Sequence, residues 1–452
     1  MSRTVIKNAT IVTMDPMRRV LTDHVLVIEG DRIQALVPAS DFEGGANDEV
    51  IDATDRFILP GFVNTHVHTV QQLGRGLADD VDLMTLLHKR IFPYESNVQE
   101  DDSYTSTMLF GLEQIANGTT TFADAGIQHP APTARAVEQL GLRAALCLSI
   151  TDDGEGLPEG WKLPAKECIS IQEQAFDAHH GGAGGRIRWW FGLRTLFNNS
   201  DDLLRMTAER SRALATGIHM HVAQSQGEVA YCQNTRGTTV IRHFRDVGLL
   251  GSNFLGAHCI YIDEEEQDLL AEFEVKVSHN PGAGLKIMGI PRIVALLQKG
   301  VRVGLATDSG ASNNRNSMID EMWLTTILQK GSHGDPSVTP AQQVLEMATI
   351  HAAECLGWED EVGSIEQGKK ADLCVIDPWT NNMQPMHDPI SNMVFCMKTE
   401  NVESTMCDGR WLMRDRKFPH LDEQEILREA SGRAAAIRER GNIELPARFP
   451  WS

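Results

Sequence analysis

The sequence predicts an α/β protein: a (β/α)8 TIM barrel with a small discontinuous β-sandwich domain built from both chain ends. Eight apolar runs, most of them ending in polar residues, alternate with helix-like stretches, which is the pattern of a parallel α/β barrel. Short runs of alternating apolar and polar residues flank this region on both sides. The 452 residues suffice for one large domain and a smaller one. The expected boundaries are 1–57 and 365–421 for the sandwich, 58–364 for the barrel, and 422–452 for a C-terminal helix and tail.

The N-terminal segment has the texture of short strands and turns. Residues 4–15, 24–37 and 48–54 alternate apolar and polar side chains, and Gly30 and Asp31 mark a turn inside the second of these runs. The first residues lack the apolar core of a signal peptide. No stretch approaches the ~18 consecutive apolar residues of a membrane span, so we expect none.

The barrel strands are expected in the eight apolar runs. Helix-like stretches lie between them; residues 201–216, for example, open with two acidic residues and stop before Gly217. The eight runs are FILPGFVNTHVHT (57–69), GTTTFADAG (118–126), LRAALCLSITD (142–152), IRWWFGLRTLF (187–197), GIHMHVAQS (217–225), NFLGAHCIYID (253–263), EVKVSHNP (274–281) and VRVGLATDSGAS (301–312).

The C-terminal part returns to strands after one more helix. Residues 339–357 read as a single helix with a glycine stop, and residues 363–377 and 402–418 as strands with tight turns. We expect these strands to join the N-terminal ones in the sandwich domain. Residues 422–440 are predicted to form an amphipathic surface helix.

Composition narrows the class of protein. The formal net charge is −21 with no long block of Lys or Arg, which argues against a nucleic-acid partner. The eight cysteines are scattered and form no CxxC pair, so we expect reduced cysteines in a cytoplasmic protein.

The first apolar run ends in two histidines, His66 and His68. Side chains two apart on a strand point the same way, and catalytic residues of a parallel barrel sit at the carboxyl ends of its strands. Neutral imidazoles are good ligands for divalent metals. We therefore predict that both histidines bind a metal ion; the alternative is a hydrogen-bonded pair of core histidines.

Three later runs end in candidate residues of the same site. The fifth run ends in His219, His221 and Gln224, of which His221 is the expected ligand; His219 lies one side-chain layer deeper and is expected to be a packed, hydrogen-bonded core histidine. The sixth run ends at His258. Asp308 follows the fully apolar eighth run, where a buried carboxylate needs a metal or a charged partner.

These residues resemble the amidohydrolase superfamily, in particular the branch that holds triazine hydrolases and deaminases of nucleosides, pterins, oxopurines and cytosine. The resemblance implies that His66, His68, His221 and Asp308 bind one zinc or iron ion, that His258 contacts the attacking water or the developing oxyanion, and that Asp308 is the base. It also suggests a homodimer or higher oligomer. The similar segments are 59–69, 75–84, 117–124, 219–224, 256–263, 306–314 and 363–377.

Two positions depart from the branch's pattern. Gln224 stands where the branch usually has a glutamate that protonates the substrate ring, and a carboxamide cannot shuttle a proton. Residues 279–284 (HNPGAG) lack the usual Ser-Asn after the HNP segment. Both departures fall in the expected substrate pocket.

The expected function is cleavage of a C–N bond of a nitrogen heterocycle by a metal-bound hydroxide, with a triazine-, purine- or pterin-like substrate. Gln224 keeps open an amidohydrolase that acts on an amide, urea, lactam or carbon–halogen bond. A barrel that binds a ligand after losing catalysis is a third reading. The expected substrate contacts are Gln71, Asp80, Asp124, Gln224 and Ser312.

Overall fold

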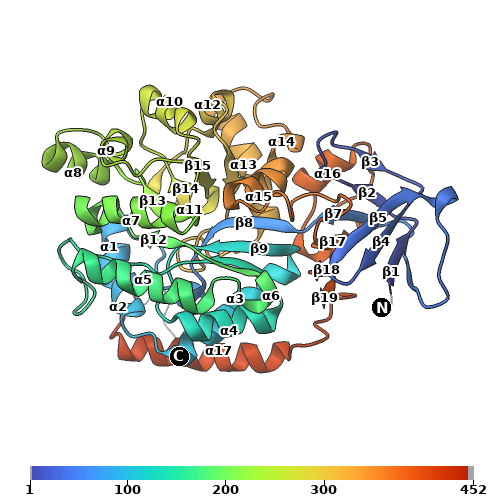
Figure 1. The fold of residues 1–452 in the computed structure, drawn as a ribbon, viewed down its shortest axis with the longest axis horizontal. Helices are drawn as coiled ribbons and strands as arrows, with labels where there is room; N and C mark the ends of the chain where they lie inside the picture. The colour runs from blue at the N-terminus through green and yellow to red at the C-terminus, as the bar shows by residue number, and fades with distance from the viewer. Residues whose placement is uncertain (1–2, 446–452) are drawn as a thin grey trace, which may run out of the picture.

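The computed structural model describes residues 3–445 of the chain. Parallel strands and their helices form the larger part of the molecule, and mainly antiparallel sheets lie at one end of it (Figure 1). The predicted α/β class is confirmed. Within the described residues, no helix combines the length and the apolar character that crossing a membrane requires.

The parallel strands form two sheets, and the edge strands of one adjoin the edge strands of the other. One has the order β11-β10-β9-β8 and the other β12-β13-β14-β15-β16. Only Trp190 separates β11 from β12 in the chain, and the backbone N–H of Asp308, just after β16, donates to the carbonyl of His66 in β8 at 2.9 Å. The strands are β8 (Phe62–Val67), β9 (Thr119–Asp124), β10 (Arg143–Leu146), β11 (Ile187–Trp189), β12 (Phe191–Leu193), β13 (Ile218–Val222), β14 (Phe254–His258), β15 (Lys276–His279) and β16 (Val303–Leu305).

Helices connect these strands, and their ends follow the sequence signals. Ser200 accepts a hydrogen bond from the N–H of Leu203 at the start of α7, and Asp263 forms a capping box with Glu266 at the start of α10. The main helices are α3 (Glu100–Ala116), α4 (Pro130–Leu140), α5 (Ala165–His179), α7 (Asp201–Ala213), α8 (Gln226–Arg236), α9 (Val240–Asp246), α10 (Glu264–Glu272), α12 (Ile293–Gln298) and α13 (Met318–His333).

The helix expected over residues 339–357 is broken in two. The structure has α14 (Ala341–Met347) and α15 (Ile350–Leu356), with non-helical backbone at Thr349. The carbonyl of Ala348 accepts a hydrogen bond from the N–H of Val63 in β8, so it is not available to continue the helix. The prediction of a single helix was wrong because this partner lies almost 300 residues away in the sequence.

The antiparallel sheets combine both ends of the chain. The four-stranded sheet has the order β5-β4-β1-β6, and the six-stranded sheet the order β19-β18-β17-β7-β2-β3. One apolar cluster contains Ile28 of the first sheet and Ile58 and Leu373 of the second. The strands are β1 (Arg3–Lys7), β2 (Thr10–Val12), β3 (Val20–Leu21), β4 (His24–Glu29), β5 (Arg32–Pro38), β6 (Glu49–Asp52), β7 (Phe57–Pro60), β17 (Leu373–Ile376), β18 (Val402–Cys407) and β19 (Arg410–Met413).

A buried charge network ties these sheets to the parallel strands. Arg143 of β10 is fully buried; its guanidinium lies 2.8 Å from the carboxylate of Asp408 and 3.3 Å from that of Asp372. A buried arginine needs such partners to offset its desolvation. The network therefore depends on residues from distant parts of the chain.

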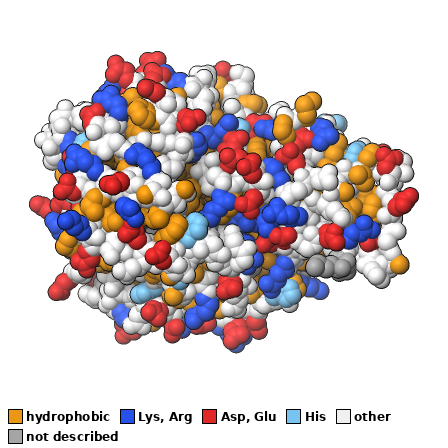
Figure 2. Space-filling model, viewed as in Figure 1, with side chains coloured by type: hydrophobic (Ala, Val, Ile, Leu, Met, Phe, Trp, Pro, Cys, Tyr) orange, Lys and Arg blue, Asp and Glu red, His pale blue; other side chains and the backbone are white. Residues whose placement is uncertain are grey.

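The last helices lie on the surface. After α16 (Pro389–Phe395), the C-terminal helix α17 (Glu423–Arg440) runs along the edge of the molecule beside α3 (Figure 1), where Arg433 pairs with Asp102 at 3.3 Å. It matches the helix expected over residues 422–440; the end of the predicted tail, residues 446–452, lies outside the described residues. On the face shown in Figure 2, Lys and Arg side chains are interspersed with Asp and Glu.

Candidate active site

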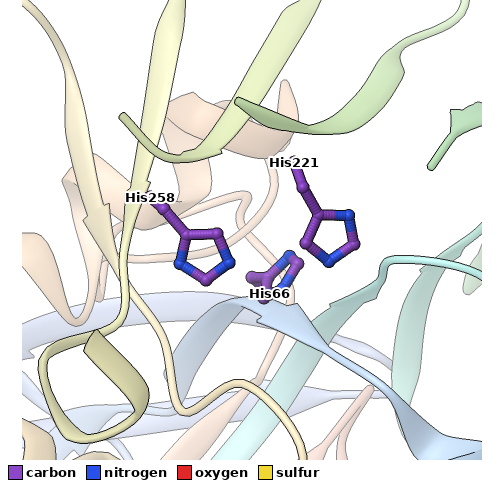
Figure 3. Close-up of side chains that lie close together, drawn as sticks. All are labelled: His66, His221 and His258. Carbon is purple, nitrogen blue, oxygen red and sulfur yellow. The ribbon is translucent and has the colours of Figure 1, made fainter. Parts of the chain in front are cut away.

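The polar side chains that follow four of the parallel strands converge on one buried point. His66 belongs to β8 and His68 follows it directly; His221 belongs to β13, His258 ends β14, and Asp308 follows β16. Figure 3 shows the rings of His66, His221 and His258 pointing toward one another. The fold thus brings together the residues that the sequence predicts to form the metal site.

The spacing of these side chains suits one shared metal ion. The Nε2 atoms of His68 and His221 face each other at 3.1 Å, and Asp308 Oδ1 lies 3.8 Å from Nε2 of both His66 and His68. Two nitrogens bound tetrahedrally at about 2.0–2.1 Å from a zinc ion would be about 3.3 Å apart. The distances therefore fit a single coordination sphere.

The histidines present lone pairs to this point. Burial lowers the pKa of His66 and His68 well below the usual value, and burial together with the charge of Arg194 lowers that of His221 to about 4. His221 Nδ1 donates to the backbone carbonyl of Arg194 at 2.8 Å, which leaves its Nε2 as an acceptor. Neutral imidazoles in this state are metal ligands.

Asp308 supplies the single carboxylate among these ligands. Burial raises its pKa to about 7, although the N–H of Ser309 donates to Oδ1 at 2.7 Å. Among the described residues, buried His66 Nε2 and His258 Nε2 have no hydrogen-bond partner. A divalent cation would satisfy the carboxylate and the unpartnered His66 nitrogen together, so the residues present fit such an ion.

His258 faces Asp308 across the cluster. Its Nε2 lies 3.9 Å from Asp308 Oδ2, and its Nδ1 lies 3.1 Å from the amide nitrogen of Asn280. The three imidazoles of His66, His221 and His258 are also close enough to hold an ion. His258 can therefore act on whatever is bound beside the metal.

A pocket opens from the cluster, and three of the five expected substrate contacts line it. Gln71, Gln224 and Ser312 are all in its wall. The backbone N–H of Gln224 donates to the carboxylate of Glu228 at 3.0 Å. The apolar part of the wall consists of Leu83, Leu86, Leu87, Ile91, Ile287 and Met288.

The other two expected contacts are placed elsewhere. The carboxylate of Asp124 accepts hydrogen bonds from the N–H and hydroxyl of Thr69 and from the N–H of Gly126, and burial raises its pKa to about 6. These bonds hold the chain just after His68. Asp80 lies between η2 (Thr69–Gly74) and α1 (Leu83–Leu86), outside the residues that line the pocket.

Two pocket features were missed from the sequence. Arg194 follows β12 and pairs with buried Glu95 at 2.9 Å, while Gln71 donates to the other oxygen of Glu95 at 2.8 Å. Arg194 lies inside the fourth apolar run, directly after β12, so a search for polar residues at strand ends could have found it. Glu95 belongs to α2 (Phe92–Glu95), far from any strand end, and no sequence signal marks it.

A second cavity adjoins the pocket. It measures about 690 Å³ and shares Leu87, Thr195 and Asn198 with the wall of the inner pocket. Its wall also includes the aromatic side chains of Phe92, Phe197 and Tyr231. This size is typical of a small-molecule site.

The buried imidazole–carboxylate cluster at the ends of parallel strands defines a metal-dependent hydrolase. The family model described as "Amidohydrolase family" matches residues 57–412. The chain belongs to the amidohydrolase family and is an enzyme that hydrolyses carbon–nitrogen bonds. The resemblance to the amidohydrolase superfamily is confirmed.

Two curated relatives are similar over nearly their whole length. A 5'-deoxyadenosine deaminase of Methanosarcina acetivorans is 35% identical over 444 residues, which cover 98% of this chain and 100% of the relative. A 5-methylthioadenosine/S-adenosylhomocysteine deaminase of Pelotomaculum thermopropionicum is 35% identical over 442 residues, covering 97% and 100%. Hydrolytic deamination of a heterocycle is the activity that these relatives support.

Two solved structures are also similar. An adenosine deaminase from Xanthomonas campestris with bound zinc superimposes with a TM-score of 0.91 at 26% identity, covering 97% of this chain and 99% of that one. A triazine hydrolase from Arthrobacter aurescens gives 0.88 at 21% identity, covering 96% and 100%. The second likeness concerns the fold alone.

Proposed function

We propose that the enzyme removes the exocyclic amino group of an aminated nitrogen heterocycle, with an adenine-type nucleoside as the leading substrate, and releases ammonia. One observation carries the proposal: Gln71, Gln224 and Ser312 surround the space directly beside the cluster of His66, His68, His221 and Asp308. The deaminases that are 35% identical to the chain support the adenine-type ring. The adjoining cavity has room for the rest of such a substrate.

The proposed metal is zinc, with iron as the alternative, held by His66, His68, His221 and Asp308. When bound, a divalent ion supplies activation of water near neutral pH. Asp308 takes the proton that is released as water adds to the ring carbon, and it returns that proton to the departing amino group. His258 stabilises the negative charge that develops on the attacked centre.

The proposal extends to the fold and the domains of the chain. We infer that the two parallel sheets belong to one closed (β/α)8 barrel, since the chain links β11 to β12 and a hydrogen bond links the end of β16 to β8. We keep the predicted domain boundaries, except that the pairing of β7 with β17 extends the small domain to Pro60.

We also propose that the protein forms a homodimer or higher oligomer. All eight cysteines are free, which supports a cytoplasmic location.

The proposal is tested by elemental analysis combined with an ammonia-release screen. Protein purified without added metal is expected to hold one divalent ion per chain and to release ammonia from adenosine-type substrates at a higher rate than from aminotriazines, pterins or cytosine. One ion per chain with no ammonia from any ring compound would contradict the deaminase. Protein without metal would contradict the site itself.

Gln224 favours a second candidate, an amidohydrolase that acts on an amide, urea, lactam or carbon–halogen bond. Its carboxamide lines the pocket and can bind a substrate but cannot protonate it. If a ring substrate limited by protonation is the natural one, Gln224→Glu is expected to raise kcat for deamination by about 100-fold, the lower end of the usual range for a general acid. Ammonia-release kinetics check this, with Gln71→Glu as the matched control. A loss of activity in Gln224→Glu would favour the second candidate.

A further inference from the structure

A second histidine of β13 contacts one of the predicted metal ligands directly. His219 Nε2 lies 2.9 Å from His66 Nδ1, and both rings are fully buried. The backbone carbonyl of Asp124 in β9 lies beside the ring of His219 and favours a proton on its other nitrogen. The sequence predicts a packed, hydrogen-bonded core histidine here but does not identify its partner, which is His66.

The order of protons along this relay follows from elementary hydrogen bonding. A carbonyl oxygen only accepts, so the nitrogen of His219 beside Asp124 carries the proton; this nitrogen is Nδ1, because Nε2 faces His66. In a neutral ring Nε2 then has a lone pair and accepts from His66 Nδ1–H. His66 is left with a lone pair on Nε2.

That lone pair is aimed at the metal cluster. His66 Nε2 is buried, has no hydrogen-bond partner within the part of the chain that the structure describes, and lies 3.8 Å from Asp308 Oδ1. The wrong tautomer of His66 would present an N–H instead, which cannot bind a cation. The orientation and tautomer of His66 therefore depend on His219.

The ligand His221 is held by a backbone group, not by a side chain. Its Nδ1 donates directly to a backbone carbonyl, that of Arg194, at 2.8 Å. A substitution elsewhere cannot remove that acceptor. Of these two ligands, His66 is the one whose second nitrogen is held by a side chain, so its support can be removed by mutation.

We propose that His219 is a positioning residue of the metal site, which fixes His66 through a relay from the Asp124 carbonyl. The inference rests on the metal-dependent function proposed above. Groups that orient a metal-binding histidine typically contribute 10–100-fold to metal affinity or activity. The relay also joins β9, β13 and β8, so it couples the ligand to strands that are far apart in the chain.

The test compares His219→Leu with His219→Gln. Leucine removes the acceptor, whereas the carboxamide keeps an acceptor and a donor at the end of the side chain. His219→Leu is expected to bind zinc about 10–100-fold more weakly in competition with a chelator. Its cobalt-loaded form is expected to have an altered visible absorption spectrum. His219→Gln should recover most of both properties.

The control is His243→Leu. His243 is another buried histidine, on α9, and its Nε2 lies 3.0 Å from the carboxylate of Asp201. This substitution is expected to lower thermal stability but to keep the wild-type zinc affinity and cobalt spectrum. Wild-type affinity and spectrum in His219→Leu would overturn the relay, as would a loss no larger than that in His243→Leu. If His219→Leu does not fold, a His219→Gln protein that binds zinc no better than a His66→Gln protein would support a purely structural role instead.

These measurements need no substrate. A wild-type enzyme that binds zinc but releases no ammonia would contradict the proposed substrate and leave the comparison of His219 variants intact. A wild-type enzyme that binds no metal would contradict the proposed function and, with it, the role of His219 in the metal site.

Discussion

The Asp308→Asn enzyme is expected to lose about 10²–10⁴-fold in kcat while keeping much of its metal. The asparagine oxygen can still bind a cation, but the carboxamide cannot accept a proton at neutral pH. In the part of the chain that the structure describes, Asp308 is the one carboxylate that groups with the buried imidazoles of His66 and His68 as a possible metal ligand. The loss should therefore appear in turnover rather than in metal content.

The measurement is ammonia release at saturating substrate, on protein whose metal content has been determined by elemental analysis. Asp268→Asn is a matched control, because Asp268 lies on α10 and pairs with Lys299 at the surface. It should keep kcat within a few-fold. Full turnover by Asp308→Asn would remove Asp308 from the proton transfer.

Removing the metal is expected to abolish activity and to lower stability. Three of the four predicted ligands, His66, His68 and Asp308, are buried, and the metal-free protein keeps their desolvation cost without the compensating charge. A metal present at about 1,000 times its dissociation constant stabilises the folded state by about 4 kcal/mol, so the free energy of unfolding should fall by about this amount.

The experiment compares protein treated with a chelator and the same protein after one equivalent of zinc is returned. Activity and Tm should fall together and recover together. His66→Ala is the control, and it should not recover at one equivalent because a ligand is missing. Undiminished turnover by protein shown to be free of metal would exclude a metal-dependent reaction.

Much of the site could be predicted because parallel strands end at a common edge. His66, His221 and His258 lie where β8, β13 and β14 end, so reading the polar residue after each apolar run was enough to group them. The same rule would have added Arg194. It could not find Glu95, which contacts Arg194 of the pocket wall from a short helix inside a long connection.

The remaining differences have specific physical causes. The carboxylate of Asp124 turns to the backbone of Thr69 and Gly126 because those N–H groups need acceptors, and this preference cannot be seen in the sequence. The sequence predicts that His219 lies one layer below His221, but its partner belongs to β8, 153 residues away. Periodicity locates a side chain on its strand, whereas its partner depends on how the strands pack.

The pairing of β7 with β17 has a consequence for how the protein is made. The strand Phe57–Pro60 is synthesised more than 200 residues before its neighbour Leu373–Ile376. Arg143 is likewise synthesised more than 200 residues before its two partners, which are Asp372 and Asp408. Until then an apolar strand has an open edge and a core arginine has no counter-ion, and such intermediates are prone to aggregate. A nascent chain therefore cannot complete its fold segment by segment, and we expect chaperones that shield exposed strands to determine the yield of active enzyme.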